Sequence, residues 1–281
     1  MDTNKVFEEQ MIAFKKYLCA EERSAGTIEN YLRHVRGFAV WLDGRAATKE
    51  AAASWKDHLI SRSYNPSTIN AMLVSLNCFF TFLGKQEYRI RTLRIQRKLF
   101  RDDSRELTRA EYDRLIAAAQ SAGKSRLALL METICATGIR VSEVQYITVE
   151  AVEKGRAEIS LKGKIRTILI PGKLRRKLLK YARKNKTVSG KIFLTRNGKG
   201  MSRKQIWAEM KAICEKAGVA PSKVFPHNLR HLFARTFYKV CRDVAKLADV
   251  LGHSSIETTR IYLITTGAEH ARQLERLGLV G

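Results

Sequence analysis

The stretch Phe225–Leu263, FPHNLRHLFARTFYKVCRDVAKLADVLGHSSIETTRIYL, decides how the C-terminal part of this 281-residue chain folds. Three of its polar side chains have spacings that put them on one face of a helix: His227, Arg230 and His231. Gly252-His253 interrupts the helical pattern, and Ser254 and Glu257 have the spacing of a capping box that opens a further helix. Tyr262 follows near the end. The stretch predicts three helices separated by turns, with polar groups gathered at the turns.

Charge is the most unusual property of the composition. The chain has 52 Lys and Arg against 27 Asp and Glu, a formal net charge of +25. Such an excess favours a polyanionic partner through counterion release and long-range attraction. Nucleic acid is the favoured partner. A membrane surface is the weaker alternative. The chain has no run of 18 apolar residues, the length that would span a bilayer, and the N-terminus MDTNKVFEEQ is no signal peptide.

Cysteine usage points to a reducing compartment. Five cysteines are widely separated and never form a C-x-x-C pair: Cys19, Cys78, Cys135, Cys214 and Cys241. They indicate reduced thiols without a structural zinc. We therefore expect a cytoplasmic protein.

Four amphipathic helices are expected in the first third of the chain. The first covers residues 5–19, and the second carries its apolar face from Ile28 to Leu42. The third runs through Trp55 to Ile60, and Asn65-Pro66-Ser67 opens the fourth. These helices would form one small bundle.

A basic segment, Lys85–Arg101, follows the bundle. Seven of its seventeen residues are Lys or Arg and only Glu87 opposes them. A charge run is usually a solvated face, but here it separates two predicted domains of a strongly basic protein, which favours a linker that tracks a phosphate backbone. The candidate DNA-binding side chains are Arg91, Arg94, Arg97 and Lys98. The predicted domains are residues 1–101, a helical DNA-binding domain with the basic linker, and residues 102–281.

Residues 102–281 predict an α+β domain in a chain that is mainly α. Thr108 and Glu111 form a capping box, and residues 125–136 form an apolar, central helix. Residues 157–170 alternate in hydrophobicity around a Lys-Gly-Lys turn, which predicts an antiparallel β-hairpin, and residues 191–194 suit a third short strand.

Three further helical segments are expected in this domain. Residues 173–186 form a basic helix without any acid, which indicates a DNA-facing or highly solvated surface. A capping box at Ser202 and Gln205 opens another helix. The tail, residues 267–281, has leucines at helical spacing and would pack on its own domain or on a neighbouring subunit.

Arg140 lies at a predicted helix break, between Ile139 and Val141. Its apolar neighbours would hold it rigidly while its head reaches a pocket. A surface arginine paired with Glu143 is the alternative, and the local sequence by itself favours that alternative.

Metal-dependent and nucleotide-dependent chemistry find little support. His227 and His231 are four residues apart, but a zinc protease helix needs H-E-x-x-H and Asn228 stands in place of the base. There is no G-x-x-x-x-G-K-[ST] loop and no acidic cluster for two magnesium ions. No metal site is therefore predicted, and His231 is better interpreted as a supporting or core residue.

Four sequence blocks together resemble the motif boxes of the tyrosine recombinases, or phage integrases, in the same order and with matching separations. They are ATGIRVSE (136–143), HNLRH (227–231), LGH (251–253) and TTRIY (258–262). Residues 1 to about 95 are similar to that family's helical core-binding domain, and the size resembles the Xer-like members with two domains. The resemblance implies a four-helix core-binding domain followed by an α+β catalytic domain.

The resemblance also implies a chemistry. Tyr262 would attack a DNA phosphodiester and leave a 3′-phosphotyrosyl link with a free 5′-hydroxyl, so that religation needs neither ATP nor another cofactor. A free phenol has a pKa of about 10 and needs assistance at neutral pH. Arg140 and Arg230 would provide it by clamping the non-bridging oxygens with planar, permanently charged groups.

The remaining roles follow from the same resemblance. His227 would transfer the proton at the nucleophile, His253 would donate a hydrogen bond to the phosphate, and Glu143 would orient its surroundings. Family members often carry a hairpin tip such as G-K-G-N-K, whereas this chain has only LKGK. The alignment selects Lys162 as the general acid for the 5′-oxygen, with Lys164 as the alternative.

The function implied is a site-specific recombinase that acts on double-stranded DNA recombination sites, as a homotetramer and through a Holliday junction. Two alternatives stay open. One is a nicking-closing enzyme of the type IB topoisomerase kind, which uses the same chemistry without strand exchange. The other is a non-catalytic DNA-binding protein, in which the boxes only shape the fold.

Overall fold

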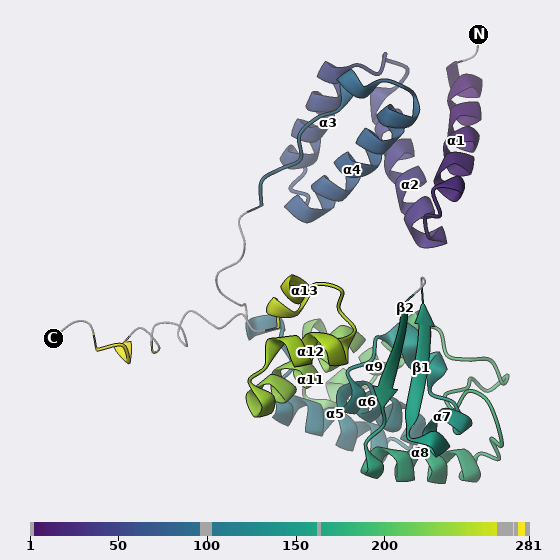
Figure 1. The fold of residues 1–281 in the computed structure, drawn as a ribbon, viewed down its shortest axis with the longest axis vertical. Coiled ribbons are helices and arrows are strands. Elements are labelled where there is room, and N and C mark those ends of the chain that lie inside the picture. Colours follow the sequence, from purple (N-terminus) through teal and green to yellow (C-terminus); the bar gives the residue numbers. More distant parts are fainter. Residues whose placement is uncertain (1–2, 96–102, 162–163, 263–271, 273–274, 279–281) are drawn as a thin grey trace. The chain divides into compact units, whose positions relative to one another are not determined.

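The computed structural model describes residues 3–95, 103–161, 164–262, 272 and 275–278. The chain divides into two compact units, Met1–Arg97 and Lys98–Gly281. The predicted domain boundary after residue 101 falls outside the described residues and stays a prediction. The predicted class, mainly helical with one small antiparallel sheet, is confirmed (Figure 1).

The N-terminal unit contains the four expected helices: α1 (Thr3–Ala20), α2 (Ala25–Leu42), α3 (Lys49–Ser61) and α4 (Pro66–Phe82). Short polar side chains fix three of the helix starts, since Ser24, Thr48 and Asn65 each accept a hydrogen bond from a first-turn N–H. Pro66 occupies the first turn of α4, where its missing N–H costs no helical hydrogen bond. The apolar faces bury a core of aromatic and aliphatic side chains.

Two asparagines of α4 hold the chain that follows the helix. Asn77 donates from Nδ2 to Ile90 O (2.8 Å) and accepts at Oδ1 from Ile90 N (3.0 Å). Asn70 makes the same two bonds with Leu93 O and Leu93 N, at 2.9 and 2.7 Å. We call these two pairs the asparagine clasps. They fix the start of the predicted linker along α4, beyond a short 3-10 turn, η1 (Gln86–Tyr88).

The C-terminal unit has a longer series of elements. They are η2 (Asp103–Arg105), α5 (Arg109–Ser121), α6 (Ser125–Thr137), η3 (Val141–Tyr146), α7 (Val149–Lys154), β1 (Arg156–Leu161), β2 (Lys164–Leu169), α8 (Gly172–Lys184), α9 (Arg203–Lys211), α10 (Cys214–Ala217), η4 (Pro221–Lys223), α11 (Pro226–Cys241), α12 (Val244–Leu251) and α13 (Ile256–Arg260). The capping boxes at Thr108 and Ser202 form as predicted.

Helix α6 is the centre of this unit, as its apolar sequence indicates. Leu127, Leu130, Met131 and Ile134 have no exposed side-chain surface. The helix packs against α5, α8, α9 and α11. It ends at Gly138, whose φ of +66° is a left-handed conformation that glycine adopts without strain.

The predicted hairpin forms, with β1 and β2 antiparallel and Ile159 opposite Arg166. The third strand predicted at residues 191–194 is wrong. Only isolated bridges occur there, Thr148 to Lys191 and Leu194 to Gly200. The apolar letters that suggested a strand instead reflect burial, because Ile192 and Phe193 enter the core from an irregular segment.

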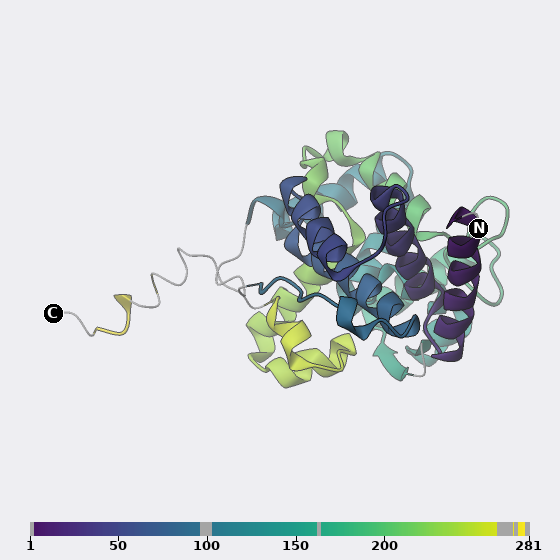
Figure 2. The ribbon, with the colours of Figure 1, turned by 90° about the horizontal axis from the view of Figure 1, so that it is seen from above.

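The last helices form a compact group that carries three of the sequence blocks. Helix α12 contacts both α11 and α13, and Figure 2 shows the same group from above. The capping box predicted at Ser254 is wrong: the N-cap is Ser255, one residue later, and its side chain accepts from Glu257 N at 3.2 Å. The predicted C-terminal tail lies mostly outside the described residues.

Candidate active site

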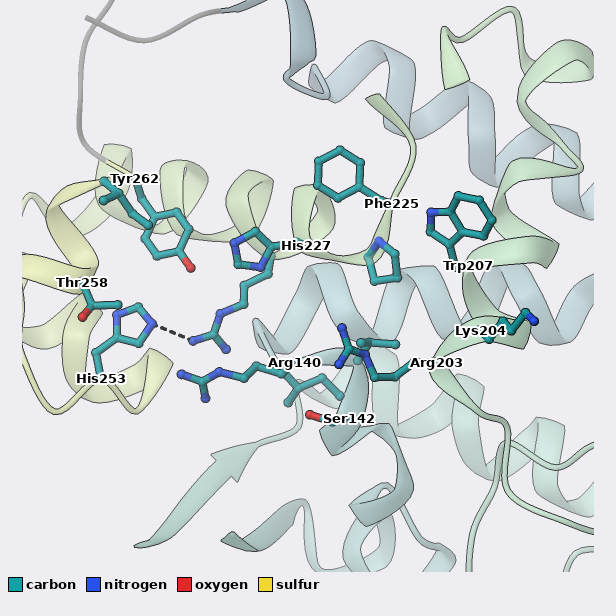
Figure 3. Close-up of a pocket in the computed structure, with 15 residues that line it drawn as sticks. Arg140, Ser142, Arg203, Lys204, Trp207, Phe225, His227, His253, Thr258 and Tyr262 are labelled. Carbon is teal, nitrogen blue, oxygen red and sulfur yellow. Dashed lines mark hydrogen bonds between the residues drawn. The ribbon is translucent and has the colours of Figure 1, made fainter. Parts of the chain in front are cut away.

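Most of the side chains that were predicted to be catalytic meet at one cleft of about 910 Å³ (Figure 3). Five of them line it: Arg140, His227, Arg230, His253 and Tyr262. Lys162 lies outside the described residues, and of Lys164 only the backbone, at the start of β2, is described. The fold thus brings together residues that are up to 122 positions apart in the chain.

Arg230, in the second turn of α11, is the most buried charged side chain of the cleft, with 1% of its surface exposed. Its guanidinium donates to Gly138 O, to Leu251 O (2.8 Å) and to His253 Nε2 (2.9 Å). Burial, reinforced by the charge of Arg140, lowers the pKa of Arg230 to about 10. The group is still a cation at neutral pH, rigidly held on three sides.

Arg140 shows features of both arrangements considered for it, pairing with Glu143 and reaching into a pocket. It precedes η3 directly, and its Nη1 lies 3.0 Å from Oε1 of the buried Glu143, while its backbone N donates to Oε2 at 2.7 Å. Its side chain is nevertheless 42% exposed and lines the cleft. The ion pair therefore aims the arginine at the cleft and does not withdraw it to the outer surface.

Tyr262 is buried, with 3% exposure, among Ala234, Leu247 and Leu251. Its ring stacks on His253 with centroids 5.8 Å apart, and His231 meets it edge-on at 4.5 Å. Figure 3 shows the Tyr262 hydroxyl directed into the cleft on the side of His227. The ring is thus fixed by packing while its reactive atom is presented.

Histidines surround the tyrosine without forming a metal site. The His227 and His231 rings meet edge-on at 4.6 Å. Among the residues that the structure describes, no three His, Cys, Asp or Glu side chains are grouped to hold a metal ion. His231 packs against Tyr262, which fits its expected supporting place.

The tautomer of His253 follows from its neighbours. A guanidinium can only donate, so Nε2 accepts from Arg230. Nδ1 then carries the hydrogen and donates to Thr259 Oγ1 at 2.8 Å. Burial and the charges of Arg230, Arg140 and Arg166 lower the pKa of His253 to about 4. The ring is therefore neutral near pH 7.

His253 should make the protein less stable as the pH falls. Because its folded pKa is about 4 and its ordinary value is 6.5, the unfolded chain binds more protons between these values. The free energy of unfolding contributed by this residue therefore declines as the pH drops from 6.5 to 4. Urea unfolding of His253→Gln should show a shallower decline than the wild type. Parallel curves for both proteins would contradict the low pKa.

The pKa of His227 is lowered as well. Burial lowers its pKa, and the charges of Arg230 and Arg140 add to the effect. A neutral imidazole can accept a proton, whereas an imidazolium cannot. His227 is therefore in the protonation state that a base beside Tyr262 requires.

Sequence reasoning missed Arg166, in β2. It donates to Glu143 and to Leu251 O, two groups that Arg140 and Arg230 also bind. A signal existed: Arg166 alternates with Ile168 and Ile170 on the inward face of the hairpin, where an arginine is unusual. Three cleft residues of α9 were also missed: Arg203, Lys204 and Trp207.

The predicted DNA-binding arginines are only partly described. Arg91 and Arg94 are exposed and lie next to the clasped residues Ile90 and Leu93. Arg97 and Lys98 fall outside the described residues. Among the described helices, none is long and apolar enough to cross a bilayer.

Comparison with known proteins identifies the family. Residues 105–268 match the phage integrase family and residues 11–87 match the phage integrase N-terminal SAM-like domain. Tyrosine recombinase XerA of Pyrococcus furiosus is 30% identical over 95% of this chain and 93% of its own. Tyrosine recombinase XerC of Roseiflexus castenholzii is 31% identical over 90% of this chain and 88% of its own. The chain therefore belongs to the phage integrase family.

Solved structures show the same fold. XerH recombinase bound to its difH substrate aligns with a TM-score of 0.67 and 21% identity, over 97% of this chain and 88% of its own. A lambda integrase dimer bound to a core site aligns with a TM-score of 0.73 and 18% identity, over 91% and 94% of the two chains. The predicted enzyme class, a tyrosine-type site-specific recombinase, is confirmed.

Proposed function

We propose that this protein cuts and rejoins double-stranded DNA at recombination sites, with Tyr262 as the nucleophile. The observation that carries the proposal is that the Tyr262 hydroxyl shares one cleft with Arg140, Arg230, His227 and His253. The tyrosine oxygen forms a bond to phosphorus, the bond from phosphorus to the 5′-oxygen breaks, and a 3′-phosphotyrosyl link is left. Attack by the 5′-hydroxyl of another strand reverses the step.

The two arginines would bind the phosphate. Each can donate two hydrogen bonds to non-bridging oxygens and stabilise the charge that develops on the pentacoordinate phosphorus. Arg230 is fixed by burial and Arg140 by its pairing with Glu143, so both guanidinium groups are held at the cleft before DNA binds. This preorganisation is the main source of catalysis that we assign to the cleft.

The proton carriers are assigned from the cleft for His227 and from the family resemblance for the lysine. His227 would accept the proton of Tyr262, and Lys162, or alternatively Lys164, would protonate the leaving 5′-oxygen. His253 would contact the phosphate. To donate from Nε2, His253 would break its present hydrogen bond with Arg230. Its ring hydrogen would also have to move from Nδ1 to Nε2.

We further propose that the protein acts in the cytoplasm as a homotetramer that passes through a Holliday junction. A lambda integrase tetramer has been solved on a Holliday junction; it shares 17% identity and a TM-score of 0.70 with this chain. The fold is thus compatible with such an assembly.

The experiment that tests the function is covalent capture from a DNA library. Nicked duplexes with a randomised central segment are incubated with the protein, denatured in SDS, and the DNA that stays attached to protein is sequenced. We expect a shared sequence among the captured duplexes, which defines the site. Without any attached DNA, the proposed cleavage through Tyr262 fails and the non-catalytic DNA-binding alternative is favoured for this chain.

The same site separates recombination from nicking and closing. Two duplexes that carry the captured sequence should exchange strands. A type IB topoisomerase-like enzyme would instead relax supercoiled plasmids without the site as efficiently as plasmids with it. Equal relaxation of both plasmids without strand exchange would favour that alternative.

Affinity for DNA should fall steeply with salt. Six to ten phosphate contacts would lower affinity by about 10³- to 10⁵-fold between 50 and 200 mM salt. Replacing Arg91 and Arg94 by glutamine should reduce the slope of log affinity against log salt by about 2, because each phosphate contact contributes about 0.9. Lys15→Gln with Lys16→Gln, on exposed positions of α1, is the matched control. An unchanged slope in the arginine variant would remove these arginines from the DNA interface.

A further inference from the structure

Arg166 lies where the β-hairpin meets the cleft. It is on the inward face of β2, with 14% of its side chain exposed, while Ile165 and Leu169 on the other face are 78% and 75% exposed. Burying a guanidinium is costly unless it is paired and hydrogen-bonded. Its position therefore calls for a specific set of partners.

The partners of Arg166 are groups that also hold the two proposed phosphate-binding arginines. Nη2 donates to Oε2 of Glu143, whose Oε1 is bonded to Arg140. Nη1 donates to Leu251 O, which also accepts from Arg230 Nη2 at 2.8 Å. One carboxylate and one carbonyl thus join three arginines in a continuous chain of hydrogen bonds.

Gly252 leaves the space that this arrangement needs. Its φ is +63°, and a Cβ at this position would lie 2.3 Å from Arg166 Cδ. The glycine that ends α12 thus allows the Arg166 side chain to pass directly beside the turn that carries His253. The close contact fixes the hairpin against this turn.

The charge of the group suits a phosphate. Three guanidinium groups and one carboxylate leave two positive charges that these four side chains do not neutralise. A phosphodiester carries one negative charge and gains a second as the pentacoordinate state forms. Arg166 itself faces Glu143 and the protein carbonyls, and it does not line the cleft of Tyr262.

We propose that Arg166 is a positioning residue that holds Arg140, through Glu143, and Arg230, through Leu251 O, at the spacing needed to bind one phosphate together. The proposal rests on the function proposed above. It differs from a purely structural role for Arg166, which would stabilise the hairpin but leave the reaction of bound DNA unchanged.

The test measures adduct formation in a single turnover, with protein in excess over the captured duplex. Arg166→Met keeps the length and apolar stem but removes the guanidinium. We expect its cleavage rate on bound DNA to fall about 10- to 100-fold, the effect of misplacing a reacting group by about 1 Å, while the Kd for DNA stays within about twofold of the wild type. Arg156→Met, an exposed arginine of the same hairpin, is the control and should cleave normally.

A double-mutant cycle tests whether Arg166 acts through Glu143. If it does, Arg166→Met should add less to the defect of Glu143→Gln than it costs in the wild type. Arg166→Lys, which can restore a charge beside Glu143 but not both hydrogen bonds, should fall between wild type and Arg166→Met. Normal cleavage by Arg166→Met, or fully additive defects in the cycle, would overturn the positioning role.

A measurement without cleavage keeps the two proposals separable. Hydrogen exchange of the His253 amide, which is bonded to Ala248 O at 3.0 Å, should accelerate in Arg166→Met but not in Arg156→Met. If the wild type forms no adduct, the proposed function fails, while the exchange result still decides whether Arg166 holds the turn. Unchanged exchange would refute that contact, whether or not DNA is cut.

Discussion

Tyr262→Phe should form no covalent adduct with the captured duplex. The substitution removes one oxygen atom and keeps the ring that packs among Ala234, Leu247 and Leu251, so the fold and DNA binding should be retained. No other atom at this position can form the bond to phosphorus. Removal of a covalent nucleophile lowers the rate by about 10⁶ in a well-studied enzyme of another class, which exceeds the range of a gel assay.

The control for this variant is Tyr238→Phe. Tyr238 packs against the same small cluster and also loses only a hydroxyl. It should form adduct at the wild-type rate. If Tyr262→Phe formed as much adduct as the wild type, another residue would be the nucleophile and the assignment would be wrong. Mass spectrometry of the peptide that retains the DNA would then identify the residue.

Arg140→Ala should separate catalysis from affinity. Losing one preorganised donor to a developing negative charge costs about 10²- to 10³-fold in rate, so adduct formation should fall by about that factor. DNA binding should change little, because many other phosphate contacts would be retained. Since the side chain is 42% exposed and Glu143 keeps its bond to Arg166, the fold should tolerate the change.

Arg109→Ala is the matched control for Arg140→Ala. Arg109 also pairs with a nearby acid, Asp113 at 3.0 Å, but it is 71% exposed and does not line the cleft. It should cleave at the wild-type rate. A loss of DNA affinity in Arg140→Ala that equals its loss of cleavage would assign Arg140 to binding and not to the chemical step.

The helices of both units could be predicted because local signals specify them. The capping box at Thr108 and the apolar run through α6 appear where the sequence places them. The segment at 191–194 misled the prediction because buried apolar residues give the same short pattern in a strand and in an irregular core segment. Pairing with another strand, which a single sequence does not encode locally, decides between them.

In the candidate site, too, some residues could be predicted from local sequence and others depend on contacts made only in the folded chain. Arg140, His227, Arg230, His253 and Tyr262 could be selected from their motif boxes, and the structure brings them to one cleft. Arg166 belongs to no motif box; its inward place in the hairpin marks it as unusual, but its partners Glu143 and Leu251 are 23 and 85 residues away and only the folded chain makes them neighbours. The tautomer of His253 likewise depends on contacts that no local pattern contains.

The asparagine clasps have a practical consequence for exchanging parts between related recombinases. Helix α4 ends at Phe82, but Asn70 and Asn77 bind the chain up to Leu93. In a chimera joined directly after Phe82, a foreign segment would have to form the four hydrogen bonds to the asparagine side chains. We expect chimeras joined after Leu93 to be the more soluble and active ones, because the transplanted segment then keeps its hydrogen bonds to Asn70 and Asn77.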